Sequence, residues 1–410
     1  MLEKENLKQA LQRVQKNKGA PGIDKMTVES LPAYLAANWT KIREQLKNGK
    51  YEPSAVRRVE IPKPGGGVRQ LGIPCVLDRF IQQALQQVLQ REWDPTFSPQ
   101  SYGFRPGKSQ HQAVKQAQKY VSSGLSIVVD IDLEKFFDRV NHDVLMSRIA
   151  KRVEDKRVLK LIRAYLNAGI MENGLISPSS EGVPQGGPLS PLLSNLMLDE
   201  LDKELEARNL AFVRYADDCN IYVSSVRAGE RVMQGITKFL AKKLRLKVNE
   251  AKSAVGKPQA RKFLGFSFTG GRAPKLKIAP ASIKAFRARI RQLTRRNRGK
   301  SIEDVVKELN IYMKGWINYF GICQTPSVLE KLQGWIRRKL RCIIWKRWRV
   351  SSTRFVRLRA LGLSTLNATE GAGNGAKGPW RMSKTPPLSM ALSNQYFRSL
   401  GLPDLKCKGA

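Results

Sequence analysis

Two adjacent aspartates lie within the segment Phe212-Val213-Arg214-Tyr215-Ala216-Asp217-Asp218-Cys219-Asn220-Ile221-Tyr222-Val223. Two runs rich in β-branched and aromatic residues flank an Ala-Asp-Asp-Cys-Asn segment, which is typical of a β-hairpin with two carboxylates at its tip. Neighbouring carboxylates repel each other, and a protein can keep both ionised when a dication such as Mg²⁺ lies between them. A solvated Asp-Asp turn is the simpler alternative, so the rest of the chain has to decide between the two.

The composition indicates a polyanionic partner. The 410 residues include 73 Lys and Arg against 34 Asp and Glu, a formal net charge of +39. Such an excess favours nucleic acid over a membrane. Residues 271–410 hold 30 basic and 6 acidic residues, whereas residues 1–270 hold 43 and 28. We therefore expect the C-terminal third to clamp a polyanion, in a chain long enough for two to four domains.

Several classes of protein are disfavoured. The sequence has no run of about 18 apolar residues that would predict a transmembrane helix, and its first residues lack the apolar core of a signal peptide. The five cysteines are scattered without a Cys-x-x-Cys pair, which argues for a reducing, cytosolic setting and against a zinc site. Only His111 and His142 are present, so chemistry that needs several histidines is excluded.

A second acidic segment ends an apolar strand predicted over residues 126–132. Asp130 and Asp132 lie on the same face of that strand because side chains alternate with a period of two. A buried carboxylate without a partner is costly, and a metal shared with Asp217 and Asp218 would supply one. The residues alone do not decide which of Asp130 and Asp132 takes part.

Three further segments carry polar groups suited to ligand contacts. Lys63 and Arg69 flank the Gly-rich tip of a hairpin predicted over residues 56–74, which is either a solvated turn or a holder for a triphosphate. The aromatic and basic loop 101–109 suits single-stranded nucleic acid, or packing. In Pro184-Gln185-Gly186-Gly187 the glycines allow a ligand or another backbone segment to approach closely. The Gln185 amide offers a hydrogen-bond donor and an acceptor at this turn.

The helical segments complete the pattern. A helix over 78–92 is expected to place Gln82, Gln83, Gln86 and Gln87 on a polar face. The 281–296 segment combines an apolar stripe with a basic one, and the scarcity of acids favours a duplex backbone as its partner over a merely solvated face. Residues 369–378 are predicted to form a flexible loop or linker. The basic stripe consists of Lys284, Arg287, Arg291 and Arg295.

Taken in order, these segments resemble reverse transcriptases, and most closely the proteins encoded by bacterial group II introns. The resemblance spans essentially the whole chain and is greatest for the compact group IIC type, which lacks an endonuclease domain, since no set of Cys and His ligands follows residue 380. The motifs that carry it are 17–24, 101–107, Phe136-Phe137-Asp138, 184–191, Tyr215-Ala216-Asp217-Asp218 and 263–266.

The resemblance implies an α+β fold, a right-hand polymerase with an antiparallel palm sheet. An N-terminal extension at 1–49 would precede the fingers and palm at 50–272. A helical thumb or maturase (X) domain would follow at 273–362, and a small DNA-binding domain at 363–410.

The resemblance also assigns roles to residues. Asp132, Asp217 and Asp218 match the family's catalytic metal ligands for two Mg²⁺ ions, which Mn²⁺ could replace. Asp132 is chosen over Asp130 because the family has an aromatic residue five positions after its catalytic aspartate, here Phe137, which would exclude a ribose 2′-hydroxyl. The other matched positions are Lys63, Arg69, Gln185 and Lys252 for the nucleotide, the last as a proton donor to pyrophosphate, and Arg105, Phe263, Gly265 and the basic stripe for nucleic acid.

The expected function is that of an RNA-directed DNA polymerase of the bacterial cytosol, associated with the nucleoid. It would copy RNA into cDNA from dNTPs by two-metal nucleotidyl transfer, and would assist intron splicing and retrohoming. Its partners would be an RNA template with a DNA primer, the group II intron RNA and target DNA, but no membrane. The alternatives are a non-catalytic RNA-binding splicing factor and a domesticated reverse transcriptase in phage defence or DNA repair.

Overall fold

The computed structural model describes residues 1–62, 67–172, 175–177, 181–184, 186–295, 298–373 and 378–407, and for residues 69, 172 and 175–177 only the backbone. Lys63 and Gln185 lie outside the described residues, and the side chain of Arg69 is not described. The chain divides into two compact units, Met1–Phe263 and Leu264–Ala410. This division comes earlier than the boundary expected at 272, and the four-domain scheme stays a prediction.

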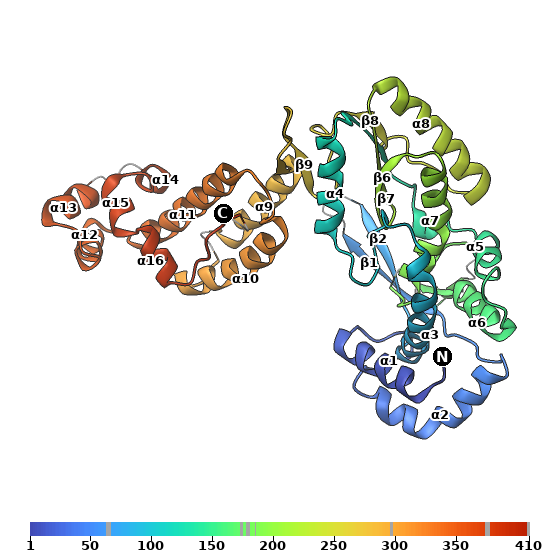
Figure 1. Cartoon of the computed structure of the whole chain (residues 1–410). Coiled ribbons are helices and arrows are strands. Elements are labelled where there is room, and N and C mark those ends of the chain that lie inside the picture. Colours follow the sequence, from blue (N-terminus) through green and yellow to red (C-terminus); the bar gives the residue numbers. More distant parts are fainter. Residues whose placement is uncertain are drawn as a thin grey trace. The chain divides into compact units, whose positions relative to one another are not determined.

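A four-stranded sheet forms the centre of the first unit (Figure 1). Its strand order is β6-β7-β3-β8, and every neighbouring pair is antiparallel. The β6–β7 pair is the predicted hairpin with the two aspartates, and β3 is the predicted acidic strand. The strands are β3 (Ile127–Ile131), β6 (Ala211–Tyr215), β7 (Asp218–Val223) and β8 (Ala254–Gly256).

The two faces of this sheet differ in chemistry. Helices α7 (Ser190–Ala207) and α8 (Val226–Phe239) lie on one side of the sheet and α4 (Gln110–Ser122) on the other (Figure 1). The alternate residues of β3 and β7 that belong to the apolar core point to one face, and the remaining residues, among them Asp130 and Asn220, point to the opposite face. The core residues are Ile127, Val129, Ile131, Cys219, Ile221 and Val223.

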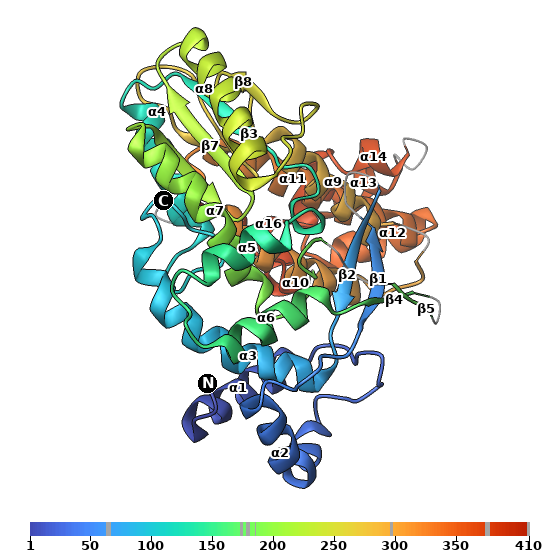
Figure 2. The same ribbon diagram turned by 90° about the vertical axis from the view of Figure 1, so that its right-hand side faces the viewer.

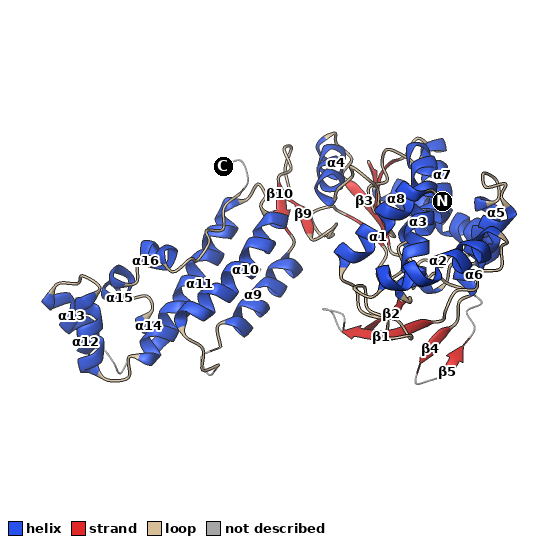
Figure 3. Ribbon diagram, turned by 90° about the horizontal axis from the view of Figure 1, so that it is seen from below, coloured by secondary structure: helices blue, strands red, loops and turns tan. Residues whose placement is uncertain are grey.

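A second sheet has the strand order β2-β1-β4-β5 (Figure 3). Strands β1 (Val56–Pro62) and β2 (Val68–Ile73) form the hairpin that the sequence predicts. Strand β4 (Ile170–Glu172) runs parallel to β1 and pairs with β5 (Leu175–Ser177). The mixture of sheets and helices confirms the predicted α+β class.

Five more α-helices and three short helical turns complete the described part of the first unit (Figure 2). Ser109 begins α4 with a capping box that it forms with Gln112. The helices are α1 (Lys4–Asn17), α2 (Leu31–Lys47), α3 (Val76–Trp93), α5 (His142–Ile149) and α6 (Lys156–Asn167), and the turns are η1 (Asp94–Thr96), η2 (Phe136–Asp138) and η3 (Leu240–Leu244).

The polar face predicted on α3 is largely buried. Gln82, Gln83 and Gln87 are buried, because α1 packs against α3 and supplies polar partners. The Gln87 amide donates to the backbone oxygen and side-chain oxygen of Asn6, at 3.1 and 2.8 Å. Buried amides are tolerated when their hydrogen bonds are made, so glutamine does not mark an exposed face here.

The second unit is mainly helical and has its own apolar core. Phe286, Ile290 and Leu293 on α9 are buried, which confirms the predicted apolar stripe. No helix in the described ranges is long and apolar enough to cross a membrane. The elements are the β9–β10 pair (Phe266–Phe268, Leu276–Ile278), α9 (Pro280–Leu293), α10 (Ile302–Phe320), α11 (Pro326–Arg347), α12 (Ser351–Ala360), α13 (Thr365–Gly373), α14 (Pro379–Met382), α15 (Pro386–Ala391) and α16 (Asn394–Ser399).

The prediction of a loop over residues 369–378 is wrong for its first half, because residues 369–373 belong to α13. Tertiary packing overrides the low helix propensity of glycine here. A Cβ at Gly371 would lie 3.0 Å from the Leu358 side chain of α12 and 3.1 Å from Pro387 of α15. The missing side chain lets the three helices approach closely. Residues 374–377 lie outside the described residues.

Candidate active site

The register of the central sheet brings the predicted acids together. Ile131 of β3 pairs with Cys219 of β7, so one step further along the antiparallel ladder Asp132 comes opposite Asp218. Opposed residues on antiparallel neighbours have Cα atoms within about 5.5 Å of each other. Tyr215 pairs with Asp218, which leaves Ala216 and Asp217 as a two-residue hairpin loop. Asp132 and the adjacent pair Asp217 and Asp218, which are far apart in sequence, thus lie at the same end of the sheet.

The electrostatic environment of Asp218 shows how crowded these acids are. Desolvation by the surrounding chain, followed by the charges of Asp217, Asp130 and Asp132, raises the pKa of Asp218 to about 6. The Asp218 side chain still reaches solvent, so water screens part of this repulsion. A cation bound among these groups would favour the ionised form of Asp218.

Asp130 and Asp132 have different partners. Arg261 donates to Asp130 Oδ2 from Nε at 3.0 Å and from Nη2 at 2.6 Å. The Asn220 amide, in the orientation that satisfies its neighbours, donates to Asp130 Oδ1 at 3.1 Å. Burial nevertheless raises the pKa of Asp130 above its ordinary value, against the opposing effect of Arg261. The Asp130 carboxylate is therefore committed to partners within the protein.

Asp132 instead faces an exposed lysine. Lys252 Nζ lies 3.8 Å from Asp132 Oδ1, and the lysine side chain is 66% exposed. The backbone of Asp132 is fixed, because its N–H donates to Ser253 Oγ at 3.0 Å and its carbonyl accepts from Asn249 N at 2.8 Å. The strand end is held while the carboxylate stays accessible, which supports the choice of Asp132 over Asp130 as the metal ligand.

The acids have the donor chemistry that a hard cation requires. Their arrangement is a different matter: among the described residues, no three or more His, Cys, Asp or Glu side chains are placed so that they could hold a metal ion together. The available donors are all carboxylate oxygens, which Mg²⁺ prefers. Their crowding and the raised pKa of Asp218 are typical of functional sites. The residues thus fit a magnesium site in their chemistry.

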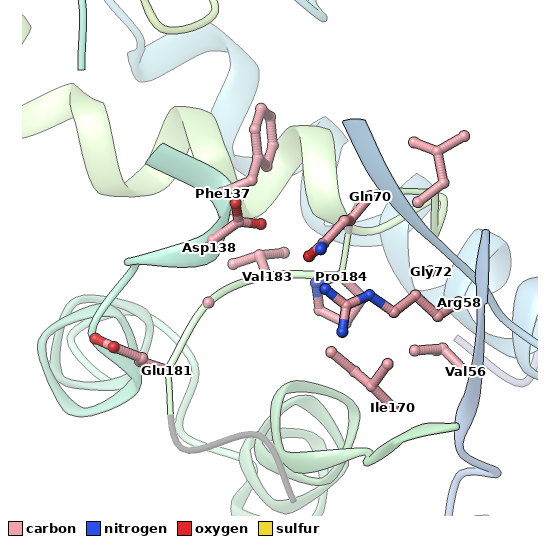
Figure 4. Close-up of a pocket in the computed structure, with 12 residues that line it drawn as sticks. Val56, Arg58, Gln70, Gly72, Phe137, Asp138, Ile170, Glu181, Val183 and Pro184 are labelled. Atoms are coloured by element: carbon pink, nitrogen blue, oxygen red, sulfur yellow. The ribbon is translucent and has the colours of Figure 1, made fainter. Parts of the chain in front are cut away.

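A cavity of about 230 Å³ lies beside Phe137 (Figure 4). Strands β1 and β2 contribute Arg58 and Gln70, and segment 181–184 forms the opposite wall. In Figure 4 the Phe137 ring projects away from the other labelled side chains, and Pro184 lies beside the end of the Arg58 side chain. Of the residues predicted to contact the nucleotide, Phe137 lies here, and Gln185 directly follows the described wall in sequence.

The backbone of this wall is bonded to the segment that carries Phe137. Val183 N–H donates to the Phe137 carbonyl at 2.6 Å, and Gly182 N–H donates to the Val140 carbonyl at 2.8 Å. Gly182 has φ +94°, and a Cβ there would lie 3.0 Å from the carbonyl oxygens of Phe137 and Asp138. Glycine is required at this close approach. The segment that carries the predicted gate and the loop before Gln185 are therefore joined directly by backbone hydrogen bonds.

His142 is a buried residue of this site that no sequence pattern pointed to. Its side chain is 2% exposed, with Nε2 2.6 Å from the Gly182 carbonyl and Nδ1 3.2 Å from Asn167 Oδ1. It therefore ties the cavity wall to α6. The only local signal is the Asn141 N-cap, which places His142 in the first turn of α5. The contact with Gly182 joins residues forty positions apart, so no local sequence pattern predicts it.

The prediction that Arg105 contacts nucleic acid is not supported by its position. Its side chain is only 6% exposed, and it forms an ion pair with Asp94 at 2.9 Å. Its guanidinium also donates to the backbone oxygens of Ser98 and Ser101, at 2.6 and 3.0 Å. Arginine is well suited to such a fork of hydrogen bonds, and here it fixes the loop instead. The neighbouring Phe104 is 43% exposed.

The other predicted nucleic-acid residues fall in two groups. Phe263 is 4% exposed, so its ring is not available to a ligand. Gly265 has φ +81°, and its carbonyl accepts from Ser282 Oγ at 3.0 Å, so it shapes the start of the second unit. Lys284, Arg287, Arg291 and Arg295 are all exposed.

The arginines of α9 lie against an aromatic ring. The guanidinium carbons of Arg287 and Arg291 lie 6.0 and 5.8 Å from the centroid of the Trp335 ring on α11, and Lys339 Nζ lies 5.4 Å from it. Contacts of this kind between exposed groups contribute about 0.5–1 kcal/mol each and leave the cations in solvent. The three cations can therefore still pair with phosphates.

Comparison with known families identifies the class of protein. The model of the family described as reverse transcriptase (RNA-dependent DNA polymerase) matches residues 61–268, half of the chain. The chain therefore belongs to the reverse transcriptases, the enzymes that act as RNA-directed DNA polymerases. A second model, described as the group II intron, maturase-specific domain, matches residues 283–362. Together the two matches confirm the resemblance to group II intron reverse transcriptases with a maturase domain.

Individual relatives agree with this family. The chain is 34% identical to Protein YkfC of Escherichia coli (strain K12) over 296 residues, which is 62% of this chain and 77% of YkfC. It is 35% identical to the group II intron-encoded protein LtrA of Lactococcus lactis subsp. cremoris over 206 residues, which is 50% of this chain and 34% of LtrA. The chain thus matches only about a third of LtrA's length.

Among solved structures, the partial Cas6-RT-Cas1–Cas2 complex is similar at 25% identity and a TM-score of 0.37, covering 58% of this chain and 41% of that one. A score this low carries no argument about function.

Proposed function

We propose that this reverse transcriptase extends a DNA primer on an RNA template with Asp132, Asp217 and Asp218 as its metal ligands, and that it assists the splicing and retrohoming of a group II intron RNA. The observation that carries the polymerase part is the register of β3 and β7, which sets Asp132 opposite Asp218 beside the hairpin loop that contains Asp217.

The chemistry follows from these positions. Nucleotidyl transfer depends mainly on positioning and on neutralising charge. Reverse transcriptases generally use divalent metal ions, and two Mg²⁺ ions, when bound, would stabilise the attacking 3′-oxygen and the leaving oxygen. Asp132, Asp217 and Asp218 would hold these ions. Lys252, whose ammonium group lies 3.8 Å from Asp132, would donate a proton to the departing pyrophosphate.

The cavity beside Phe137 would take the sugar of the incoming nucleotide, and the Phe137 ring would clash with a 2′-hydroxyl. The Phe137 backbone is bonded to Val183 at 2.6 Å, which limits how far the ring can shift. Lys63, Arg69 and Gln185 would contact the triphosphate and base. The exposed cations of α9 would follow the phosphate backbone of the template and primer, or of the intron RNA.

The test of the polymerase assignment is primer extension with an RNA template, a DNA primer, dNTPs and Mg²⁺. The wild-type chain should extend the primer, and Asp217→Ala should lose this activity while it still binds the duplex. Asp143→Ala is a matched control, because that carboxylate is 79% exposed and lies on α5. Full activity of Asp217→Ala would refute the assigned site, and a wild-type chain that binds RNA without extending any primer would favour the non-catalytic splicing factor.

The maturase part is tested separately with a cognate intron RNA at a Mg²⁺ concentration too low for self-splicing. Both the wild type and Asp217→Ala should promote splicing there, because splicing assistance requires RNA binding and not polymerisation. Absence of splicing with either protein would remove this part of the proposal and leave the polymerase part intact.

A further inference from the structure

Arg214 on β6 is fully buried and makes every hydrogen bond that a guanidinium can donate. Its side chain and that of its ion-pair partner Asp202 on α7 are both 0% exposed. Nε donates to Asp202 Oδ1 at 2.7 Å and Nη2 to Asp202 Oδ2 at 2.5 Å. The three remaining N–H groups donate to Asn195 Oδ1 at 3.0 Å, to the Ala216 carbonyl at 2.9 Å and to Ser101 Oγ at 2.8 Å.

Arg214 therefore connects three separate elements around the hairpin loop with the aspartates. One arm reaches the carbonyl of Ala216, which directly precedes Asp217. The Arg214 backbone is bonded as well, since its N–H donates to the Gln100 carbonyl at 3.0 Å and its own carbonyl accepts from Tyr102 N at 2.8 Å. A buried network in which every donor is satisfied is rigid, because any displacement leaves a polar group unpaired.

The backbone that Arg214 holds is strained. Ala216 has φ +56°, at the first position of a two-residue loop where the turn type favours glycine. An alanine keeps this unfavourable conformation only when its surroundings impose it. Gly103 packs against the other side of the loop, where a Cβ would lie 2.2 Å from Ala216 N. Its carbonyl accepts from Asn195, the same side chain that binds Arg214.

We propose that Arg214 is a positioning residue of the active site: through the Ala216 carbonyl it fixes the hairpin loop and so sets where the carboxylates of Asp217 and Asp218 point. This inference rests on the proposed function, in which those carboxylates hold the metal ions. Arg214 does not contact the reacting atoms in this scheme. It acts by preventing the strained loop from relaxing, and would thereby keep the metal ligands in one arrangement.

The alternative is that the Arg214–Asp202 pair only stabilises the fold. Removing one partner would leave a buried charge unpaired and could unfold the unit, so single removals do not separate the two roles. Replacing both partners by apolar residues of similar size is often neutral for stability. The double variant Arg214→Met/Asp202→Leu therefore removes the anchor on Ala216 without leaving an unpaired charge.

The test measures binding of Mn²⁺ alone, by titration with electron paramagnetic resonance of the free ion, together with the melting temperature. The double variant should melt near the wild-type temperature and bind Mn²⁺ about tenfold or more weakly. Hydrogen exchange of the amides in 215–219 should be faster than in the wild type. Tyr51→Phe, which removes the buried hydrogen bond to Asp78 at 2.8 Å, is the control for lost stability and should keep the wild-type Mn²⁺ affinity.

The possible results separate the role of Arg214 from the existence of the metal site. Wild-type Mn²⁺ affinity and unchanged exchange in a folded double variant would overturn the role of Arg214 and leave the proposed site standing, provided that Asp217→Ala loses binding. Wild-type affinity of Asp217→Ala would overturn the metal site, and the inference with it. If the double variant does not fold, Arg214→Lys decides in the same way, because lysine keeps the charge beside Asp202 but lacks the second arm that reaches Ala216.

Discussion

The arginine nearest the paired aspartates and the arginines of α9 show how differently the two units use the same side chain. In the first unit, Arg214 is fully buried and bound to five acceptors. In the second unit, Arg287 and Arg291 are exposed and lie against the Trp335 ring. A buried guanidinium fixes geometry, whereas an exposed one supplies a field that salt can screen. Substitutions in the first unit should therefore change turnover and selectivity, and those in α9 should change affinity.

The largest effect is expected from Asp132→Asn. If Asp132 is a metal ligand as proposed, its loss removes several kcal/mol of transition-state stabilisation, so primer extension should fall by about a thousandfold. Asp130→Asn is the matched control, because Asp130 is already bound by Arg261 at 2.6 Å, and its activity should fall by about tenfold at most. The activity of both variants is measured as the single-turnover rate of primer extension. Equal loss in the two variants would mean that the residues have been assigned to the wrong roles.

The next effect is one of selectivity. Phe137→Ala should admit ribonucleotides, because it removes the ring that is proposed to clash with the 2′-hydroxyl. Steric discrimination of this size is worth about 10- to 200-fold in the ratio of kcat/KM values for dNTP and rNTP. Phe136→Ala serves as a comparison, since the Phe136 ring packs at 5.2 Å on Phe137 but belongs to the buried core. An unchanged ratio in Phe137→Ala would show that another residue forms the gate.

A smaller effect is expected on affinity from the triple variant Lys284→Ala/Arg287→Ala/Arg291→Ala. Three lost phosphate contacts should weaken binding of an RNA–DNA duplex roughly tenfold at low salt and reduce the salt slope of log K by about 2. The rate at saturating duplex should stay near wild type.

The control for α9 is Lys41→Ala/Arg43→Ala/Lys47→Ala, which removes the same charge from exposed positions of α2. An equal change in salt slope in this control would mean that net charge, and not the α9 surface, governs binding.

The smallest effect on activity should come from Asp78→Asn, which tests stability alone. Burial raises the pKa of Asp78 from 3.8 to about 6, although Tyr51 and Ser54 donate hydrogen bonds to the carboxylate. The folded state binds the proton more tightly than the unfolded state, so the free energy of unfolding should fall as pH rises from about 4 to 6. The expected loss is about 3 kcal/mol, measured by urea unfolding. Asp78→Asn should lack this slope, and an equal slope in both proteins would contradict the assignment.

The local elements could be read from the sequence because short-range patterns define them. The β6–β7 hairpin, the acidic strand β3 and the apolar stripe of α9 all follow from periodicity and turn chemistry. The Ser109 cap of α4 is a signal of the same kind. Sequence patterns did not show which polar side chains are buried, as for Gln87 and Arg105. Burial of a polar side chain depends on its partner, and that partner is distant in the chain.

The sequence by itself determined the family, the α+β class and the acids that could hold a metal, because residue types in a fixed order are enough for that. Only the tertiary structure decided that Asp130 is bound by Arg261 while Asp132 remains accessible, and that Arg214 donates to the Ala216 carbonyl, directly before Asp217. These contacts join residues up to 131 positions apart. Strand register and helix packing create them, and neither is encoded in any short window of sequence.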